Sequence, residues 1–236
     1  MILTKQKILE YRDSGQIIIE PFTPALVRTN SVDVRITGPF FRRVGLPDQP
    51  GADIVLPYFN QQESRNQYDY IEPLRLSQLK DMAWENCDRA FTRGAITELP
   101  SRFGEETLAW YLVPGIYLAT TVEAIGTRGT PHRRLDDGTP VYLVPDIDSK
   151  STWGRWGLTV CVCAGRGDVG YCSRWTLEVR VETPTVIIDR TVAGQVRFTE
   201  ALGSLEDEEV YGAEQDSYLG HEAVVVQLPK SLKVIP

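Results

Sequence analysis

Residues 107–126 read TLAWYLVPGIYLATTVEAIG, in which two apolar runs flank the pair Pro114-Gly115. Pro followed by Gly is typical of a tight turn, so this stretch predicts a strand, a turn and a second strand. Further short strands are predicted downstream at VYLVPDI, GLTVCVCA, RWTLEVRVE and TVIIDRTVAGQVRF. Short strands at near-regular spacing are typical of a sandwich, jelly roll or barrel. We therefore expect a mainly β fold with a few short helices.

Towards the N-terminus, residues 4–14 predict a short helix, with Thr4 as its N-cap and Gly15 as its end. The segments QIIIEPF and SVDVRITGPFFRRV then alternate apolar and polar residues, as strands do. The N-terminal half thus adds a helix and two strands to the predicted β fold.

The domain organisation expected from the sequence is simple, because no internal repeat or linker stands out. Residues 1–236 are predicted to form one domain, with 46–105 as an insertion and 203–236 as a tail that can close over a site. Within the insertion, residues 46–75 are rich in Pro, Gln, Asn and Asp and predict a long loop. Residues 76–91 predict a helix, because apolar residues recur there at helical spacing.

The composition excludes several classes of function. Lys and Arg number 25 against 32 Asp and Glu, a net charge of −7, which argues against a nucleic-acid-binding surface. No apolar run reaches the ~18 residues that a membrane span needs. The charged N-terminus also lacks the apolar run of a secretory signal, so we expect a soluble, cytoplasmic protein without membrane partners.

A zinc site is not expected. Cys161 and Cys163 alternate within a predicted strand, which favours buried thiols over metal ligands. His132 and His221 have no partner at metal-ligand spacing, and the HxE…PCxxC signature of zinc deaminases is missing.

The candidate chemistry lies in residues 150–178, KSTWGRWGLTVCVCAGRGDVGYCSRWTLE. Two hydroxyls and two cations at its start can hold a polyphosphate, or can form a solvated polar strand end. Near the end of this segment, Glu178 is expected on the sheet face opposite Leu177 and Val179. A glutamate on the protein surface would show the same pattern, so this position alone does not indicate a function. The GxGxxG pattern in AGRGDVG precedes a predicted strand and not a helix, so it does not indicate a dinucleotide site.

Several blocks, taken in order, resemble the dCTP deaminase family. IIIEPFTPALVRTNSVDVRI resembles the family's N-terminal I-x-I-x-P-F and S-V-D-L/V-R-L segments, and YLVPGIYLATTVE resembles L-x-P-G-E-F-V-L-A-x-T-x-E. KSTWGRWGLTV resembles R-S-S-L-A/G-R-L-G-L, the segment up to TLEV resembles the block that ends in L-E-L, and VAGQVRF resembles R-I-G-Q-L-x-F. The resemblance implies a dUTPase-like β-barrel or jelly-roll-type fold and a homotrimer with active sites shared between subunits.

The resemblance also implies roles for individual residues. Glu178 matches the catalytic glutamate, Ser151 and Arg155 match its companions, and the backbone at Ala164 matches a group that holds the attacking water. Residues that match the nucleotide-binding positions, with Mg²⁺ carried by the triphosphate, are Lys150, Ser151, Thr152, Arg155, Asp168, Tyr171 and Gln195.

The activity implied is hydrolytic deamination of dCTP to dUTP and ammonia without zinc, with Glu178 acting as general base and then acid. Two alternatives remain open. A bifunctional enzyme would continue to dUMP and pyrophosphate, and Asp168 would matter most there. A nucleotide-binding regulatory homologue would bind dCTP, dUTP or dTTP without turnover. The turn at 167–170 without proline and the altered tail favour this reading, whereas the retained Glu178, Ser151 and Arg155 speak against it. Lys150 in place of arginine and Thr152 in place of serine point instead to a nucleotide identity or affinity that differs from the family norm.

Overall fold

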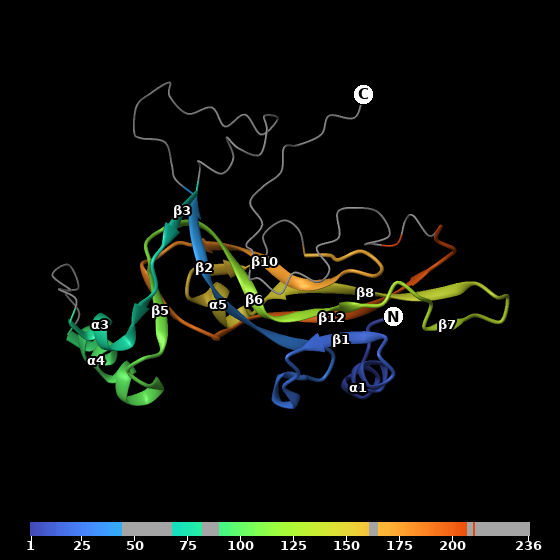
Figure 1. Cartoon of the computed structure of the whole chain (residues 1–236), viewed down its shortest axis with the longest axis horizontal. Coiled ribbons are helices and arrows are strands. Elements are labelled where there is room, and N and C mark those ends of the chain that lie inside the picture. The colour runs from blue at the N-terminus through green and yellow to red at the C-terminus, as the bar shows by residue number, and fades with distance from the viewer. Residues whose placement is uncertain (44–67, 82–89, 161–164, 207–209, 211–236) are drawn as a thin grey trace, which may run out of the picture.

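The structure is a computed structural model, and it describes residues 1–43, 68–81, 90–160, 165–206 and 210. Strands make up about half of the described chain and the helices are few and short (Figure 1), so the expectation of a mainly β fold is confirmed.

A curled antiparallel sheet forms the body of the molecule. Its strand order is β7-β8-β12-β2-β6-β10-β9, with β1 added to β6 and β3 added to β2. The bounds of these strands are β1 Ile17–Glu20, β2 Val32–Arg43, β3 Tyr68–Ile71, β6 Gly115–Thr127, β7 Arg133–Arg134, β8 Pro140–Ser149, β9 Leu158–Val160, β10 Cys172–Val181 and β12 Val192–Leu202. The curl brings β9 back to β8, where the Val160 N–H donates to the Ser149 Oγ at 3.3 Å.

One face of this sheet encloses the main core. Val34 and Ile36 of β2 and Leu177 and Val179 of β10 are each 0% exposed, because period-2 alternation points them to the same side. Residues adjacent to them in sequence, which include Thr37 and Glu178, lie on the opposite side. We call this opposite side the open face of the sheet.

A second, smaller sheet has the order β11-β5-β4, with bounds β4 Leu74–Arg75, β5 Leu108–Leu112 and β11 Thr185–Ile188. It packs with α3 (Leu76–Asp81) and α4 (Ala90–Phe103) around the buried side chains of Leu76, Leu79, Ile96 and Ala109. In Figure 1 this unit lies at the left end of the large sheet.

Pro114 and Gly115 do separate two strands, as predicted, but β5 and β6 do not pair with each other. Each strand belongs to a different sheet. The chain crosses between the sheets twice at this point, since Val181 of β10 lies opposite Gly115, and Thr185 of β11 lies opposite Leu112. Pairing with β10 and β11 therefore replaces the local hairpin that the sequence suggests.

At the N-terminus the predictions are confirmed. Helix α1 spans Lys5–Asp13 with Thr4 at its N-cap, and Gly15 follows with φ +76°, a conformation that glycine adopts at no steric cost. Ile8 of α1 is 0% exposed in the main core. A short 3-10 helix, η1 (Pro24–Leu26), then leads into β2.

One prediction within 46–105 needs correction, and a second is tested only in part. Residues 68–75, expected in a loop, form β3 and β4 because they pair with strands distant in sequence. The helix expected over 76–91 is described only as α3, whereas residues 82–89 lie outside the described chain. Helix α4 was not predicted, since Pro100 lies inside it.

A buried histidine lies where the β7–β8 hairpin meets α1 and β12. The His132 side chain is 0% exposed, packs edge-on against Tyr11 at 4.8 Å between ring centroids, and has its Nε2 3.3 Å from the Glu200 Oε1. Among the described residues, neither ring nitrogen has a partner that meets hydrogen-bond geometry. Burial lowers the pKa of His132 below its ordinary value of 6.5, although Glu200 opposes this.

We predict that the protein loses stability as the pH falls below about 6.5, by up to ~1.4 kcal/mol per pH unit. The folded-state pKa of His132 is depressed, so the unfolded chain takes up the proton first and acid favours unfolding. Urea titrations between pH 8 and 5 measure this slope, and His132→Phe, which keeps the ring packing, should flatten it. An equal slope in the variant would contradict the prediction.

Candidate active site

The segment from Lys150 to Arg155 forms a short exposed helix at one end of the sheet. Helix α5 (Ser151–Arg155) lies between β8 and β9, with Lys150 as its N-cap. Trp153 anchors it: this side chain is 6% exposed, and its indole N–H donates to the Val192 carbonyl at 2.9 Å. Because one side of α5 is anchored, the hydroxyls of Ser151 and Thr152 and the Arg155 guanidinium are exposed.

Lys150, next to this helix, belongs to a group of ion pairs around a buried carboxylate. Its Nζ lies 2.7 Å from the Oδ1 of Asp33, and the Arg28 Nε lies 2.5 Å from the other carboxylate oxygen. The Asp33 side chain is 0% exposed. Gln195 of β12 is in register with Asp33 of β2, so it borders the same group. Two cations around one carboxylate leave a net positive charge next to the exposed hydroxyls of α5.

Arg28 and Asp33 were missed as members of this cluster, which we call the α5 cluster: Arg28, Asp33, Lys150, Ser151, Thr152, Arg155 and Gln195. The signal that points to Asp33 is the SVDVR block, which carries a carboxylate inside a strand of otherwise buried residues. A carboxylate buried at that position needs a cationic partner. The sequence does not reveal which cation it pairs with.

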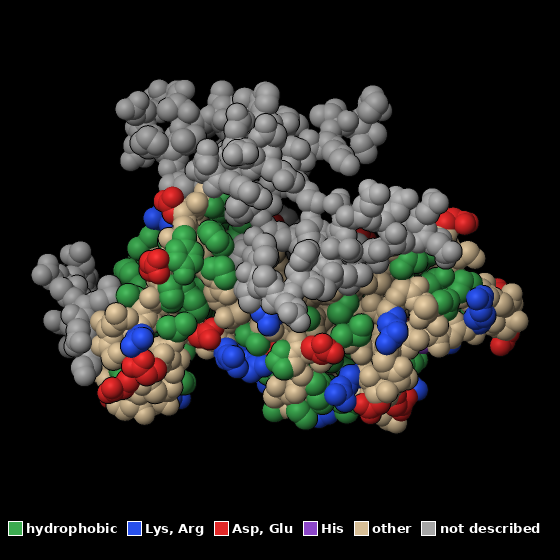
Figure 2. All heavy atoms as spheres, viewed as in Figure 1, with side chains coloured by type: hydrophobic (Ala, Val, Ile, Leu, Met, Phe, Trp, Pro, Cys, Tyr) green, Lys and Arg blue, Asp and Glu red, His purple; other side chains and the backbone are tan. Residues whose placement is uncertain are grey.

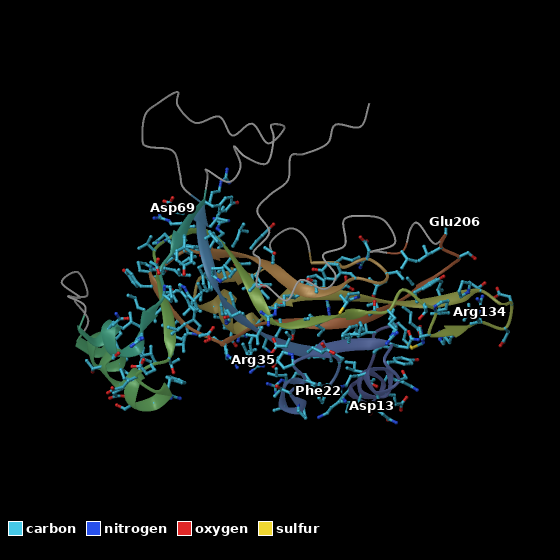
Figure 3. The ribbon with its side chains drawn as sticks, in the orientation of Figure 1. Asp13, Phe22, Arg35, Asp69, Arg134 and Glu206 are labelled. Carbon is cyan, nitrogen blue, oxygen red and sulfur yellow. The ribbon has the colours of Figure 1, made fainter. Side chains whose placement is uncertain are left out.

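A second buried carboxylate holds the middle of the sheet together. Glu123 of β6 is 0% exposed, and its two oxygens accept from the Arg35 Nε at 2.6 Å and from the Arg35 backbone N–H at 2.8 Å. Figure 3 labels Arg35 near the centre of the molecule, on β2. The acidic residue of the family-like TTVE block is therefore an ion-pair partner that joins β6 to β2.

Glu178 occupies the position that the alternation predicts. It lies on the open face of β10, in register with Leu118 of β6, while Leu177 and Val179 on either side are buried in the core. Its side chain is half-buried. Within the described chain, no hydrogen bond or ion pair joins Glu178 to Ser151 or Arg155. One copy of the chain thus brings together the α5 cluster but does not join Glu178 to it.

Asp168 and Tyr171 bracket a tight turn after the segment 161–164, which includes Ala164 and lies outside the described residues. The Tyr171 N–H donates to the Asp168 carbonyl at 3.0 Å, and Gly170 has φ +88°, so the turn needs glycine there. Asp168 is exposed, and the Tyr171 ring packs edge-on against Trp175 at 4.7 Å. No helix follows these glycines: β10 begins at Cys172, as the strand prediction requires.

Most of the cysteines cannot be placed. Cys87, Cys161 and Cys163 lie outside the described residues. Burial raises the pKa of the Cys172 thiol to about 11, so this side chain stays protonated near neutral pH. In the part of the chain that the structure describes, no group of His, Cys, Asp and Glu side chains has the arrangement of a metal site. None of the described helices has the length and apolar character to cross a membrane.

Comparison with known proteins adds to this geometry. The family described as dCTP deaminase-like matches residues 109–201. A protein of Cytophaga hutchinsonii named "dCTP deaminase, dUMP-forming" is 32% identical over 164 residues, which cover 69% of this chain and 83% of that protein. The chain belongs to the dCTP deaminase family. The motif resemblance and the family assignment therefore agree.

Other relatives match over shorter spans. A Leptospira biflexa protein of the same name is 31% identical over 97 residues, 41% of this chain and 48% of that protein, so the match spans about half of its length. Among solved structures, the 2′-deoxycytidine 5′-triphosphate deaminase of Agrobacterium tumefaciens superposes with a TM-score of 0.47 and 16% identity, over 86% of this chain and 48% of that chain.

We predict that Arg28 and Lys150 stabilise Asp33 redundantly. Arg28→Met or Lys150→Met alone should cost about 1 kcal/mol, because the other cation still neutralises the carboxylate. The double variant should cost ~3–5 kcal/mol, since it leaves a buried charge unpaired. Urea unfolding measures all three, with Lys7→Met, which breaks an exposed pair, as a control expected within ~0.5 kcal/mol of wild type. Additive losses would contradict this interpretation.

Proposed function

We propose that this chain deaminates dCTP, with Glu178 as the group that moves protons. The observation that carries the proposal is the contrast among its carboxylates. Asp33 and Glu123 are fully buried and each is held by cationic side chains, which suits a structural role. Glu178 is half-buried on the open face, and no described cation pairs with it. A carboxylate in such a setting is available to accept and return a proton.

The proposed reaction consumes one water and releases one ammonia. Glu178 takes a proton as water adds to C4 of the cytosine ring, N3 receives a proton, and the 4-amino group leaves as ammonia, which yields the uracil ring. Ser151 donates or accepts a hydrogen bond as each step requires, and Arg155 orients the water or the carboxylate as a permanent cation. The backbone at Ala164 is proposed to hold the attacking water.

We assign the triphosphate to the α5 cluster. Ser151, Thr152 and Arg155 are exposed there next to Lys150, so charge-assisted hydrogen bonds to phosphate oxygens are available. Mg²⁺ fits as an ion carried by the triphosphate, because both oxygens of Asp33 are already taken by cations. The remaining nucleotide contacts proposed by resemblance are Gln195, Asp168 and Tyr171.

We further propose that the complete site is assembled between copies of the chain in a homotrimer. Support comes from the lack of a hydrogen bond or ion pair between Glu178 and the α5 cluster within the described part of a single copy. Trp156, directly after Arg155, is 73% exposed, and a large aromatic side chain in that position gains stability when a second copy covers it.

We propose dUMP as the end product. The bifunctional activity is therefore preferred over deamination that stops at dUTP. The support is that relatives from several organisms carry the name "dCTP deaminase, dUMP-forming". Hydrolysis of dUTP would add a second water and release pyrophosphate. Asp168, exposed at its turn, is proposed to handle that second water.

Glu178→Gln should lower dCTP turnover by about 10²–10⁴-fold while the protein still binds dCTP, because the amide cannot move the proton. Ammonia release in the presence of Mg²⁺ measures turnover, and calorimetry measures binding. Glu182→Gln is the matched control, since Glu182 is an exposed glutamate just beyond the same strand. Unchanged turnover in Glu178→Gln would remove the proposed role, and binding of dCTP by wild type without turnover would favour a regulatory protein.

Asp168→Asn should convert a dUMP-forming enzyme into one that accumulates dUTP. The first step depends on Glu178 and continues, whereas the second loses its carboxylate. Chromatography of the nucleotide products from dCTP separates dUTP, dUMP and pyrophosphate. Asp136→Asn, an exposed loop aspartate, serves as the control. If wild type itself stops at dUTP, the monofunctional alternative holds.

A further inference from the structure

The 46–105 segment returns to the sheet close to Glu178. Its strand β3 adds to the edge of β2, with Tyr68 opposite Arg43 and Tyr70 opposite Phe41. In Figure 1, β3 lies alongside the end of β2. This part of the chain is therefore a neighbour of the proposed active site in space, although the family-like blocks do not include it.

The strand registers place these residues on the same face as Glu178. Phe41 is opposite Leu118, and Leu118 is opposite Glu178, so a row runs across the sheet from Tyr70 to Glu178. Side chains of directly opposed residues share a face. Tyr68, two residues before Tyr70, projects on that face as well.

The row has an apolar middle and polar ends. Leu118 is 6% exposed, and the Phe41 ring packs against Tyr70 at 5.8 Å between centroids. Figure 2 shows apolar side chains gathered at this end of the molecule. Strands lie ~4.8 Å apart, so the row from Tyr70 to Glu178 spans about 14 Å.

The Tyr68 phenol is available to a ligand. It is half-buried, and no hydrogen bond to it is present in the described part of the chain. Burial raises the pKa of Tyr68, the Arg43 guanidinium opposes this, and the Glu178 carboxylate adds to the rise. The hydroxyl thus stays protonated at neutral pH, and it lies within the electrostatic reach of Glu178.

We propose that Tyr68 is a specificity-determining residue of the Glu178 site, whose hydroxyl hydrogen-bonds the base of a cytosine nucleotide that lies against the partly exposed Phe41 ring. The proposal rests on the proposed function, because it takes the nucleotide base to lie next to Glu178. It gives the 46–105 segment a role in substrate selection. The base is held between the carboxylate on one side and the neutral phenol on the other.

Tyr68→Phe tests this proposal, because it removes only the hydroxyl and keeps the ring. We expect kcat/KM for dCTP to fall about tenfold or more, mainly through KM, with an unchanged melting temperature. Tyr70→Phe is the matched control: it lies on the same strand and face, is 48% exposed, and should behave as wild type. A merely structural role for Tyr68 would be rescued by phenylalanine.

Calorimetry of dCTP binding in a Glu178→Gln background keeps the test independent of turnover. There, adding Tyr68→Phe should raise Kd about tenfold, while Tyr70→Phe should not. Equal Kd and kcat/KM in wild type and Tyr68→Phe would overturn the inference and leave the deaminase proposal standing. If Tyr68→Phe raises Kd but wild type shows no turnover, Tyr68 remains a binding residue and the deaminase proposal is rejected. If wild type does not bind dCTP at all, both proposals are rejected.

Discussion

The buried carboxylate of Asp33 is the constraint on which the site depends. A charge at 0% exposure is tolerated only with close partners, and Asp33 has two, Arg28 and Lys150. These contacts tie the start of β2 to the loop before it and to the N-cap of α5. The position of the exposed α5 hydroxyls therefore depends on the ion pair between Lys150 and Asp33, which are far apart in sequence. The same group leaves excess positive charge where the triphosphate is proposed to bind.

The acidic residues in the family-like blocks divide into two kinds. Asp33 and Glu123 are charge partners that fix strand positions, and Arg35 grips Glu123 through both its side chain and its backbone N–H. Glu178 differs because it lies on the open face without a described cation. Sequence patterns treat these three residues alike, since each is an acid in a strand. Burial and ion pairing distinguish the two structural carboxylates from Glu178, the carboxylate that is proposed to react.

On the open face, Glu178 shares the sheet surface with β3, which belongs to the 46–105 segment that the family-like blocks do not cover. Cross-strand registers extend from Glu178 through Leu118 and Phe41 to β3, so described residues of the 46–105 segment lie on the same face as the proposed catalytic group. The proposed site thus draws on Glu178, the α5 cluster and β3, which belong to different elements of the chain. In this proposal, selection of the base and binding of the phosphates are tasks of different elements.

Local pattern by itself determined the mainly β fold, helix α1 with its glycine end, the outward direction of Glu178, and the family, because alternation, caps and motif spacing are properties of neighbouring residues. It did not determine that β5 and β6 part into different sheets, that 68–75 forms strands, that α4 accommodates Pro100, or that Lys150 pairs with Asp33. Each of these depends on contacts between distant segments, whose partners only the folded chain brings together.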